Sequence, residues 1–224
     1  MVRTSLYTRI EGEQAPWRNR KGFLSQNVLA VCDFERNFTY ILAGWEGSAH
    51  DGRVFASARS KDFEHPGGRH YYLADAGYVV SDMTLTPYRS TGYHLREWIG
   101  ASKRPETKEE LFNLRHFQLR NVIERTFGVF KNRVEITGTA RKFSMRTQVR
   151  LIYALAGVHN LMNKTDRGCA SEDLTEEDLD EVEDGDNDYT SAAAEGGGSI
   201  AMNELREAMS KRMWEDYQAY VAQR

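Results

Sequence analysis

Short apolar runs dominate the first part of the chain. Residues 25–34 have an apolar, β-branched centre, residues 38–45 repeat this pattern, and the turn-like residues 35–37 join them. Two such runs on either side of a short turn are typical of a β-hairpin. Residues 70–74 predict a third, short and buried strand, whereas residues 51–59 predict a helix.

Longer helical periods follow in the second part. Apolar residues recur near helical spacing over residues 108–132 and 147–163, while residues 81–105 contain prolines and glycines and are expected to be irregular. One further apolar stripe has steps of three or four residues and consists of Met202, Leu205, Met209, Met213, Tyr217 and Val221. We therefore expect an α/β fold with helices packed on a small mixed sheet. The C-terminal helix would dock on this domain or bind a partner helix.

The charges of the chain are unevenly distributed. The net charge is -3, yet eleven of the 33 acidic residues lie in residues 171–188, which leaves 22 acids against 30 bases elsewhere. Residues 166–198 are acidic and then glycine-rich, so we predict a disordered linker between a domain at 1–165 and a helix at 199–224. The basic remainder favours a polyanionic partner, although the charges could also be scattered over a solvated surface.

The cysteines and the apolar runs exclude several classes of protein. Cys32 and Cys169 stand far apart, so neither a zinc site nor a disulfide framework is expected. No apolar run approaches the ~20 residues of a membrane helix, and the first residues lack the pattern of a signal peptide.

Two carboxylates occupy positions suited to metal chemistry. Asp75 follows the strand predicted at 70–74, where ligands of α/β folds commonly bind. Glu124 lies in an otherwise apolar and basic stretch of the helix predicted at 108–132. Carboxylates suit Mg²⁺ and Mn²⁺, and two such ions can activate phosphodiester cleavage. The alternative for Glu124 is a surface salt bridge with Arg120, one helical turn away.

Other polar residues admit two interpretations. Asp51 lies at a predicted helix start, where capping or a favourable interaction with the helix dipole is the ordinary role, and Ser48 is a plausible cap. Several basic residues could contact phosphates, although each signal is weak alone. These are Arg18, Arg20, Lys21, Arg120, Lys131, Arg141 and Lys142.

Five strings occur in the order found in one known family. They are Trp17-Arg-Asn-Arg-Lys-Gly22, Gly44-Trp-Glu-Gly-Ser-Ala-His-Asp51, Leu73-Ala-Asp-Ala-Gly-Tyr78, Leu111-Phe-Asn-Leu-Arg115 and Asn121-Val-Ile-Glu-Arg-Thr-Phe-Gly128. Through them the chain resembles the PIF/Harbinger-type transposases and the nucleases derived from them. The resemblance implies an RNase H-like mixed sheet flanked by helices and a metal-dependent nuclease or strand-transfer activity on double-stranded DNA.

The resemblance also assigns residues. Asp75 matches the second acid of an Asp-Asp-Glu triad, Glu124 matches the third, and Asp51 matches a further metal ligand. The family implies Mg²⁺ or Mn²⁺ as the cofactor, a Myb-like DNA-binding partner and a nuclear location, to which we add the cytoplasm as a second location. The C-terminal helix could also pair with a second copy of itself and so form a homo-oligomer.

One feature of the family is missing from the chain. The first acid belongs to an Asp-Gly-Thr-like motif whose expected place falls at or just before Met1, and no such motif is present. We therefore expect a missing or incomplete first strand and an impaired metal site. The alternative to an enzyme is a catalytically inactive module that binds DNA or protein.

Overall fold

A computed structural model describes most of the chain, and the described residues form two compact units. The described residues are 2–7, 14–19, 21–89, 91, 104–134, 143–165 and 199–223. The first unit comprises Met1–Glu64 and Val122–Asp188, and the second comprises His65–Asn121 and Tyr189–Arg224. Helix α3, Lys108–Arg133, contributes its first half to the second unit and its second half to the first. The predicted linker at 166–198 lies outside the described residues.

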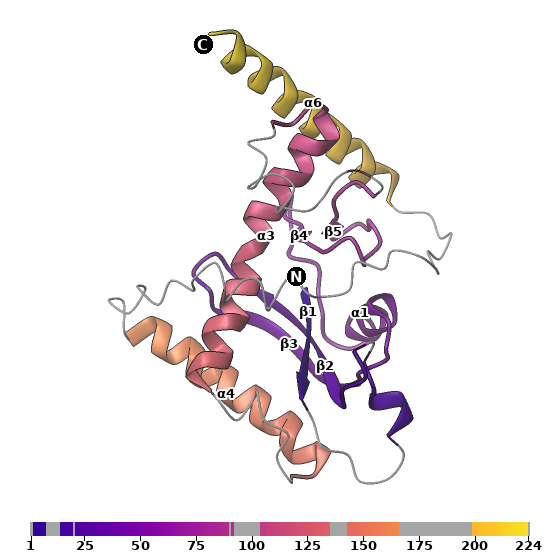
Figure 1. Cartoon of the computed structure of the whole chain (residues 1–224), viewed down its shortest axis with the longest axis vertical. Coiled ribbons are helices and arrows are strands. Elements are labelled where there is room, and N and C mark those ends of the chain that lie inside the picture. Colours follow the sequence, from indigo (N-terminus) through magenta and orange to yellow (C-terminus); the bar gives the residue numbers. More distant parts are fainter. Residues whose placement is uncertain are drawn as a thin grey trace. The chain divides into compact units, whose positions relative to one another are not determined.

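An antiparallel sheet of three strands organises the first unit (Figure 1). The predicted hairpin is confirmed as β2, Ser25–Cys32, and β3, Phe38–Glu46. Its turn is closed by Asp33, whose Oδ1 accepts the Asn37 N–H at 2.8 Å. A further strand, β1 at Val2–Tyr7, pairs with β2 along its whole length, from Val2 opposite Ala30 to Tyr7 opposite Ser25. A missing or incomplete first strand was expected, and the described residues include this six-residue strand before the hairpin.

Strand β2 is buried on both faces, because helices cover the sheet from two sides. Tyr40, paired with Val31, lies 4.7 Å from the Phe63 ring, which in turn lies 5.8 Å from Phe55 of helix α1, Asp51–Arg59. Side chains alternate between the faces of a strand, so Ala30, next to Val31, points to the other face. Sequence analysis predicted α1 with these bounds.

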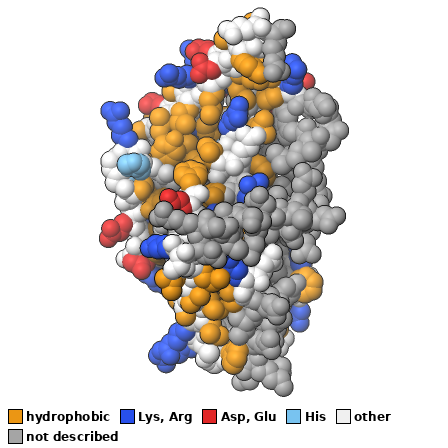
Figure 2. Space-filling view, turned by 90° about the vertical axis from the view of Figure 1, so that its left-hand side faces the viewer, with side chains coloured by type: hydrophobic (Ala, Val, Ile, Leu, Met, Phe, Trp, Pro, Cys, Tyr) orange, Lys and Arg blue, Asp and Glu red, His pale blue; other side chains and the backbone are white. Residues whose placement is uncertain are grey.

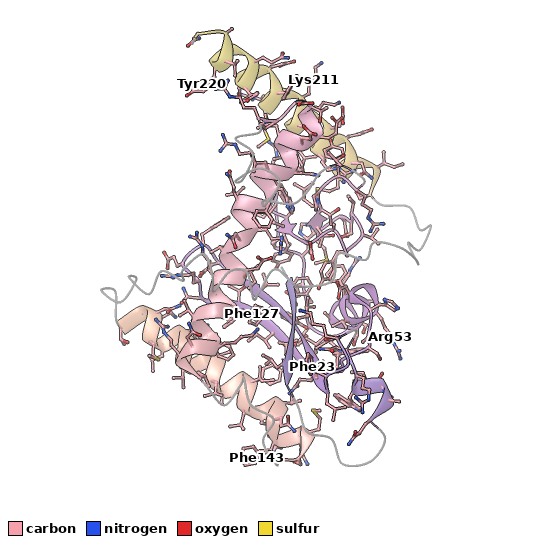
Figure 3. All side chains as sticks on the ribbon, viewed as in Figure 1. Phe23, Arg53, Phe127, Phe143, Lys211 and Tyr220 are labelled. Atoms are coloured by element: carbon pink, nitrogen blue, oxygen red, sulfur yellow. The ribbon has the colours of Figure 1, made fainter. Side chains whose placement is uncertain are left out.

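Helices α3 and α4 pack against that other face of the sheet. Helix α4 spans Met145–Thr165, slightly longer than the predicted 147–163. The shared core consists of Ala30, Phe38, Ile123, Phe127, Phe130 and Ala156. Phe127 is labelled in Figure 3, and its ring lies 5.4 Å from the Phe38 ring.

Polar residues of α4 hold the hairpin turn. The Asn160 side chain accepts the Phe38 N–H and donates to the Phe38 carbonyl, both at 2.8 Å. The buried His159 bonds through Nε2 to the Arg36 carbonyl at 3.0 Å. Arg36 has a positive φ of 66°, so these bonds stabilise a backbone conformation that a non-glycine residue rarely adopts.

Two very short parallel strands lie at the centre of the second unit. Strand β4 is Tyr72–Leu73 and strand β5 is Thr84–Leu85. The strand predicted at 70–74 is therefore present but shorter, and β5 lies in a stretch expected to be irregular. Helix α6, Ile200–Ala222, closes this unit. Its Met202 packs with Leu85 and Phe112 in one core cluster, which confirms that the C-terminal helix docks.

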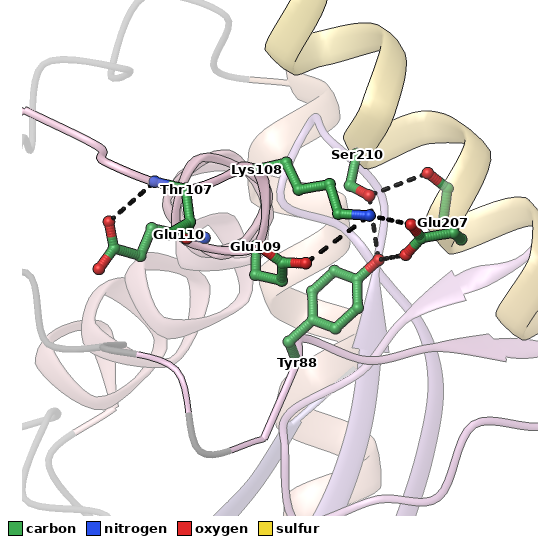
Figure 4. A network of polar contacts seen from close by, with 7 residues as sticks. All are labelled: Tyr88, Thr107, Lys108, Glu109, Glu110, Glu207 and Ser210. Atoms are coloured by element: carbon green, nitrogen blue, oxygen red, sulfur yellow. Dashed lines mark hydrogen bonds and ion pairs between the residues drawn. The ribbon is translucent and has the colours of Figure 1, made fainter.

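A polar network also holds α6 to the rest of the second unit (Figure 4). The Tyr88 hydroxyl donates to Glu207 at 3.0 Å and lies 3.0 Å from the Ser210 hydroxyl. Lys108 forms an ion pair with Glu207. The Arg206 guanidinium lies 4.3 Å from the centroid of the Tyr88 ring. Tyr88 therefore makes both polar and cation–π contacts with one face of the helix.

Some apolar side chains remain exposed on the surface. Figure 2 shows hydrophobic side chains among the Lys and Arg side chains of one face. On α4 the exposed large hydrophobic residues are Tyr153, Val158, Leu161 and Met162. None of the helices in the described part of the chain is long and apolar enough to cross a membrane.

Candidate metal-binding acids and their supports

Asp75 lies on a tight turn that begins just after strand β4. Its Oδ1 accepts the N–H of Ala76 at 2.8 Å, and its backbone carbonyl accepts the N–H of Tyr78 at 3.0 Å. Ala74, Ala76 and Tyr78 are buried, whereas Asp75 is half-buried. The turn therefore anchors the backbone on both sides of a carboxylate that keeps access to solvent.

Histidine 116 supports the strand that carries Asp75. His116 on α3 is 3% exposed, and its Nε2 lies 3.1 Å from the Leu85 carbonyl. The same carbonyl accepts the N–H of Ala74 at 2.9 Å, one residue before Asp75. Burial lowers the pKa of His116 to about 4, although the bond to the Leu85 carbonyl and the charge of Asp75 act in the opposite direction. The imidazole is therefore neutral at physiological pH.

Asp51 is the first residue of α1, and a buried asparagine shapes the loop before it. His50, and not Ser48 as expected, is the N-cap residue. The Asn27 side chain, which has no exposed surface, donates to the carbonyls of Glu46, Gly47 and Ala49 at 2.9, 3.2 and 3.2 Å. Asn27 on β2 thereby fixes the loop from which the half-buried Asp51 starts its helix.

Glu124 is an acid within the core side of α3. It is 7% exposed and stands between the buried residues Ile123 and Phe127 of the first unit. A carboxylate with so little access to water needs polar or cationic partners, because burial disfavours its charged form. The alternative considered for Glu124 was a surface salt bridge with Arg120. Because Glu124 is buried, a surface salt bridge does not fit it.

The predicted acids divide between the two units. Asp51 and Glu124 belong to the first and Asp75 belongs to the second. Their carboxylate oxygens are the ligands that Mg²⁺ and Mn²⁺ prefer, so the donor chemistry fits a divalent cation. Across the described ranges, however, no three His, Cys, Asp or Glu side chains come together in a group that could hold a metal.

The basic residues predicted to contact DNA have different surroundings. Arg18 and Lys21 are exposed at a turn, and Arg18 donates to the Gly22 carbonyl at 3.0 Å. Lys131 is half-buried. Arg120 is only 5% exposed and its guanidinium lies 5.6 Å from the Phe117 ring, so a surface phosphate contact does not fit it. Arg20, Arg141 and Lys142 lie outside the described residues.

Sequence reasoning missed the supports of the acids. Asn27 lies at the polar start of a strand and His116 lies in a helical stretch that mixes apolar and polar residues, so the pattern alone does not separate them from surface residues. Asn113 was noted only as part of the string Leu111–Arg115. It is 1% exposed, and its side chain accepts the Tyr88 N–H at 2.8 Å and donates to the Tyr88 carbonyl at 3.0 Å. One signal could have identified Asn113: it is a polar residue at a helix position whose spacing otherwise places apolar residues in the core.

A comparison with known protein families identifies the family of this chain. A family model described as DDE superfamily endonuclease matches residues 2–160, which include Asp51, Asp75 and Glu124. The chain belongs to the DDE superfamily endonucleases. The match covers α1, β4, β5, α3 and most of α4, and it ends before α6.

Curated relatives agree with this family. The human protein named "Putative nuclease HARBI1" is 29% identical over 157 residues, covering 66% of this chain and 40% of the relative. The cattle protein of the same name has the same identity and coverage. "Protein ALP1-like" of Arabidopsis thaliana is 22% identical over 169 residues, covering 68% of this chain and 39% of its own length. The chain thus matches about two-fifths of each relative, and no solved structure matches it.

Proposed function

We propose that this chain is a divalent-metal-dependent DNA endonuclease or strand-transfer domain derived from a Harbinger-type transposase. Asp75 and Glu124 are the catalytic acids of the proposal, and Asp51 is a further metal ligand. The single observation that carries it is the family match over residues 2–160, which contains all three acids.

The local structure supports the proposal at two of these positions. Asp75 follows a parallel strand pair on a turn with two backbone hydrogen bonds, so its carboxylate is presented on a fixed backbone. Glu124 is buried on helix α3 next to Ile123 and Phe127 of the core, so its carboxylate is largely shielded from bulk water. An antiparallel β1–β2–β3 sheet, followed by a helix and a parallel strand pair, is also compatible with an RNase H-like fold.

In this proposal Asp75 and Glu124 would both hold the divalent cation, but from different surroundings. A divalent cation held by these carboxylates would supply Lewis-acid activation of the phosphodiester and of the attacking oxygen. Asp75 would be one of the residues that hold the cation, presented on a turn where its carboxylate also accepts the Ala76 N–H. Glu124 would contribute a carboxylate from which the protein excludes bulk water.

Cleavage of duplex DNA tests this proposal. Wild-type protein, Asp75→Asn and Glu124→Gln are incubated with plasmid DNA and either Mg²⁺ or Mn²⁺, and nicking is followed on gels. Glu35→Gln serves as the matched control, because Glu35 is an exposed acid in the hairpin turn. We expect metal-dependent nicking by the wild type and the control and its loss in both site variants. Equal nicking by all four proteins, or none by the wild type, contradicts the nuclease.

A catalytically inactive module that binds DNA is the second candidate. It is supported by the lack of a three-ligand group among the described side chains and by the basic balance outside the acidic segment. A titration with labelled duplex at several salt concentrations discriminates the two. Binding with a steep salt dependence but without cleavage favours the module.

Partners and location belong to the same proposal. We infer double-stranded DNA as the ligand, a nuclear location and assembly with a Myb-like DNA-binding protein or a second copy of the chain. The similarity to the protein named "Putative nuclease HARBI1" supports a nucleic acid as the ligand, and the transposase resemblance favours DNA. Microscopy of the tagged protein tests the location, with exclusion from the nucleus as the contrary result.

A further inference from the structure

One backbone carbonyl in the second unit has two donors from different elements. The Leu85 carbonyl accepts the Ala74 N–H at 2.9 Å and lies 3.1 Å from His116 Nε2. Because Ala74 directly precedes Asp75, the Leu85 carbonyl links His116 of helix α3 to the backbone next to the candidate acid. The turn bonds of Ala76 and Tyr78, together with the bond from Arg89 to the Tyr78 carbonyl at 3.1 Å, also hold the backbone around Asp75.

The strands themselves offer little support to this point. Each of β4 and β5 has two residues, and their ladder is correspondingly short. A two-stranded pair is at best marginally stable without packing from other elements. The orientation of Asp75 therefore depends on bonds that come from outside the ladder, and His116 supplies one of them.

The hydrogen-bonding state of His116 follows from its surroundings. A carbonyl accepts a proton, so Nε2 carries the N–H and Nδ1 carries a lone pair. Nδ1 is buried and has no hydrogen-bond partner among the described residues. A protonated ring would bury a second N–H without an acceptor, which is unfavourable. The ring is therefore a neutral donor that makes a single directed bond.

We propose that His116 is a positioning residue for Asp75, which it acts on through the Leu85 carbonyl and the Ala74–Asp75 backbone. The proposal rests on the proposed function, in which Asp75 is a metal ligand. Outer residues of this kind change metal affinity by about 10- to 100-fold when they are removed. A general role in stability, the ordinary role of a buried histidine, predicts instead that any loss follows overall unfolding.

The test uses the full chain and four substitutions. His116→Leu removes the donor, and His116→Gln keeps an N–H that can reach the same carbonyl. Asp75→Asn removes the proposed ligand. His70→Leu is the matched control, because His70 is an exposed histidine of the same unit. Hydrogen exchange of the peptide covering residues 71–80 is measured without metal, and Mn²⁺ binding is measured by calorimetry.

Two results together support the proposal. His116→Leu should speed exchange in residues 71–80 by about two- to tenfold, the range expected for one neutral hydrogen bond. It should also weaken Mn²⁺ binding by about 10- to 100-fold, while His116→Gln and His70→Leu remain close to the wild type.

Contrary results separate the two proposals. Unchanged exchange in folded His116→Leu overturns the positioning role, whatever the metal result. Faster exchange together with wild-type Mn²⁺ binding also overturns it, because Asp75 would then not depend on the support. If the wild type binds no Mn²⁺, or if Asp75→Asn binds as the wild type does, the proposed function fails instead, and the exchange result still decides whether His116 orders the backbone.

Discussion

Replacing Asn113 by leucine should destabilise the second unit by about 2 kcal/mol. The Asn113 side chain accepts the Tyr88 N–H at 2.8 Å and donates to the Tyr88 carbonyl at 3.0 Å. It therefore satisfies both backbone groups of Tyr88, as a paired strand would. Leucine has nearly the same size but leaves both backbone groups without this partner. Each orphaned group costs about 1 to 3 kcal/mol when it is buried. We take the lower end, since Tyr88 itself is half-buried and water can reach part of it.

Urea unfolding followed by circular dichroism measures this change, and hydrogen exchange assigns it to a unit. We expect faster exchange in peptides around Tyr88 and in α6, because Tyr88 contacts Glu207 and Ser210. Asn132→Leu is the control, since Asn132 is exposed on the same helix. A loss below about 0.5 kcal/mol, the usual range for surface substitutions, would show that the bonds to Tyr88 are not an important support.

Two further predictions concern other buried polar residues. The unfolded state binds more protons than the folded state between the ordinary histidine pKa of 6.5 and the pKa of about 4 of His116, so the unfolding free energy should fall as pH falls through this window. The difference between wild type and His116→Gln across pH isolates this contribution, at most about 3 kcal/mol, and parallel curves would refute it. Asn27→Leu should weaken the loop before Asp51 by about 1 to 3 kcal/mol, seen as faster exchange over residues 46–50, and unchanged exchange would contradict the support from Asn27.

The long elements of the fold were predictable because their patterns are long. The hairpin at 25–45, helix α1 and helix α3 bury regular faces, and their bounds agree with the sequence pattern to within a few residues. Helix α6 was also predicted, but its apolar stripe is only partly buried. Met202 is buried, whereas Leu205 is exposed, because only one side of the helix packs on the unit.

The strand at 70–74 was predicted, but its two-residue length and the presence of β5 could not be, for a physical reason. Two-residue strands such as β4 and β5 have no period, and they are defined by the register Leu73 opposite Leu85 rather than by composition. Strand β1 is also hard to recognise from the sequence, because polar residues interrupt its apolar ones. Its pairing with β2 joins residues that lie far apart along the chain. Propensity is a poor guide where tertiary pairing decides.

The acids were easier to propose than the residues that hold them. Asp75 and Glu124 stand out because a carboxylate in an apolar context is costly, and the family strings around them then give each a role. Asn27, Asn113 and His116 have no such cost in the sequence, since an amide or imidazole is neutral. Their importance arises from backbone groups far along the chain, from 19 residues away for Glu46 to 31 for Leu85.

Helix α3 contributes residues to both units and is linked to two of the candidate acids. Asp75 and Glu124 have 48 residues between them in sequence, yet α3 supports the first through His116 and carries the second. The string Leu111–Arg115 has no metal ligand, but Asn113 within it holds Tyr88, which in turn contacts α6. A family string without a candidate ligand of its own therefore stabilises the unit that carries Asp75. It follows that substitutions at His116 should act on Asp75, and that substitutions at Ile123 or Phe127 should act on Glu124.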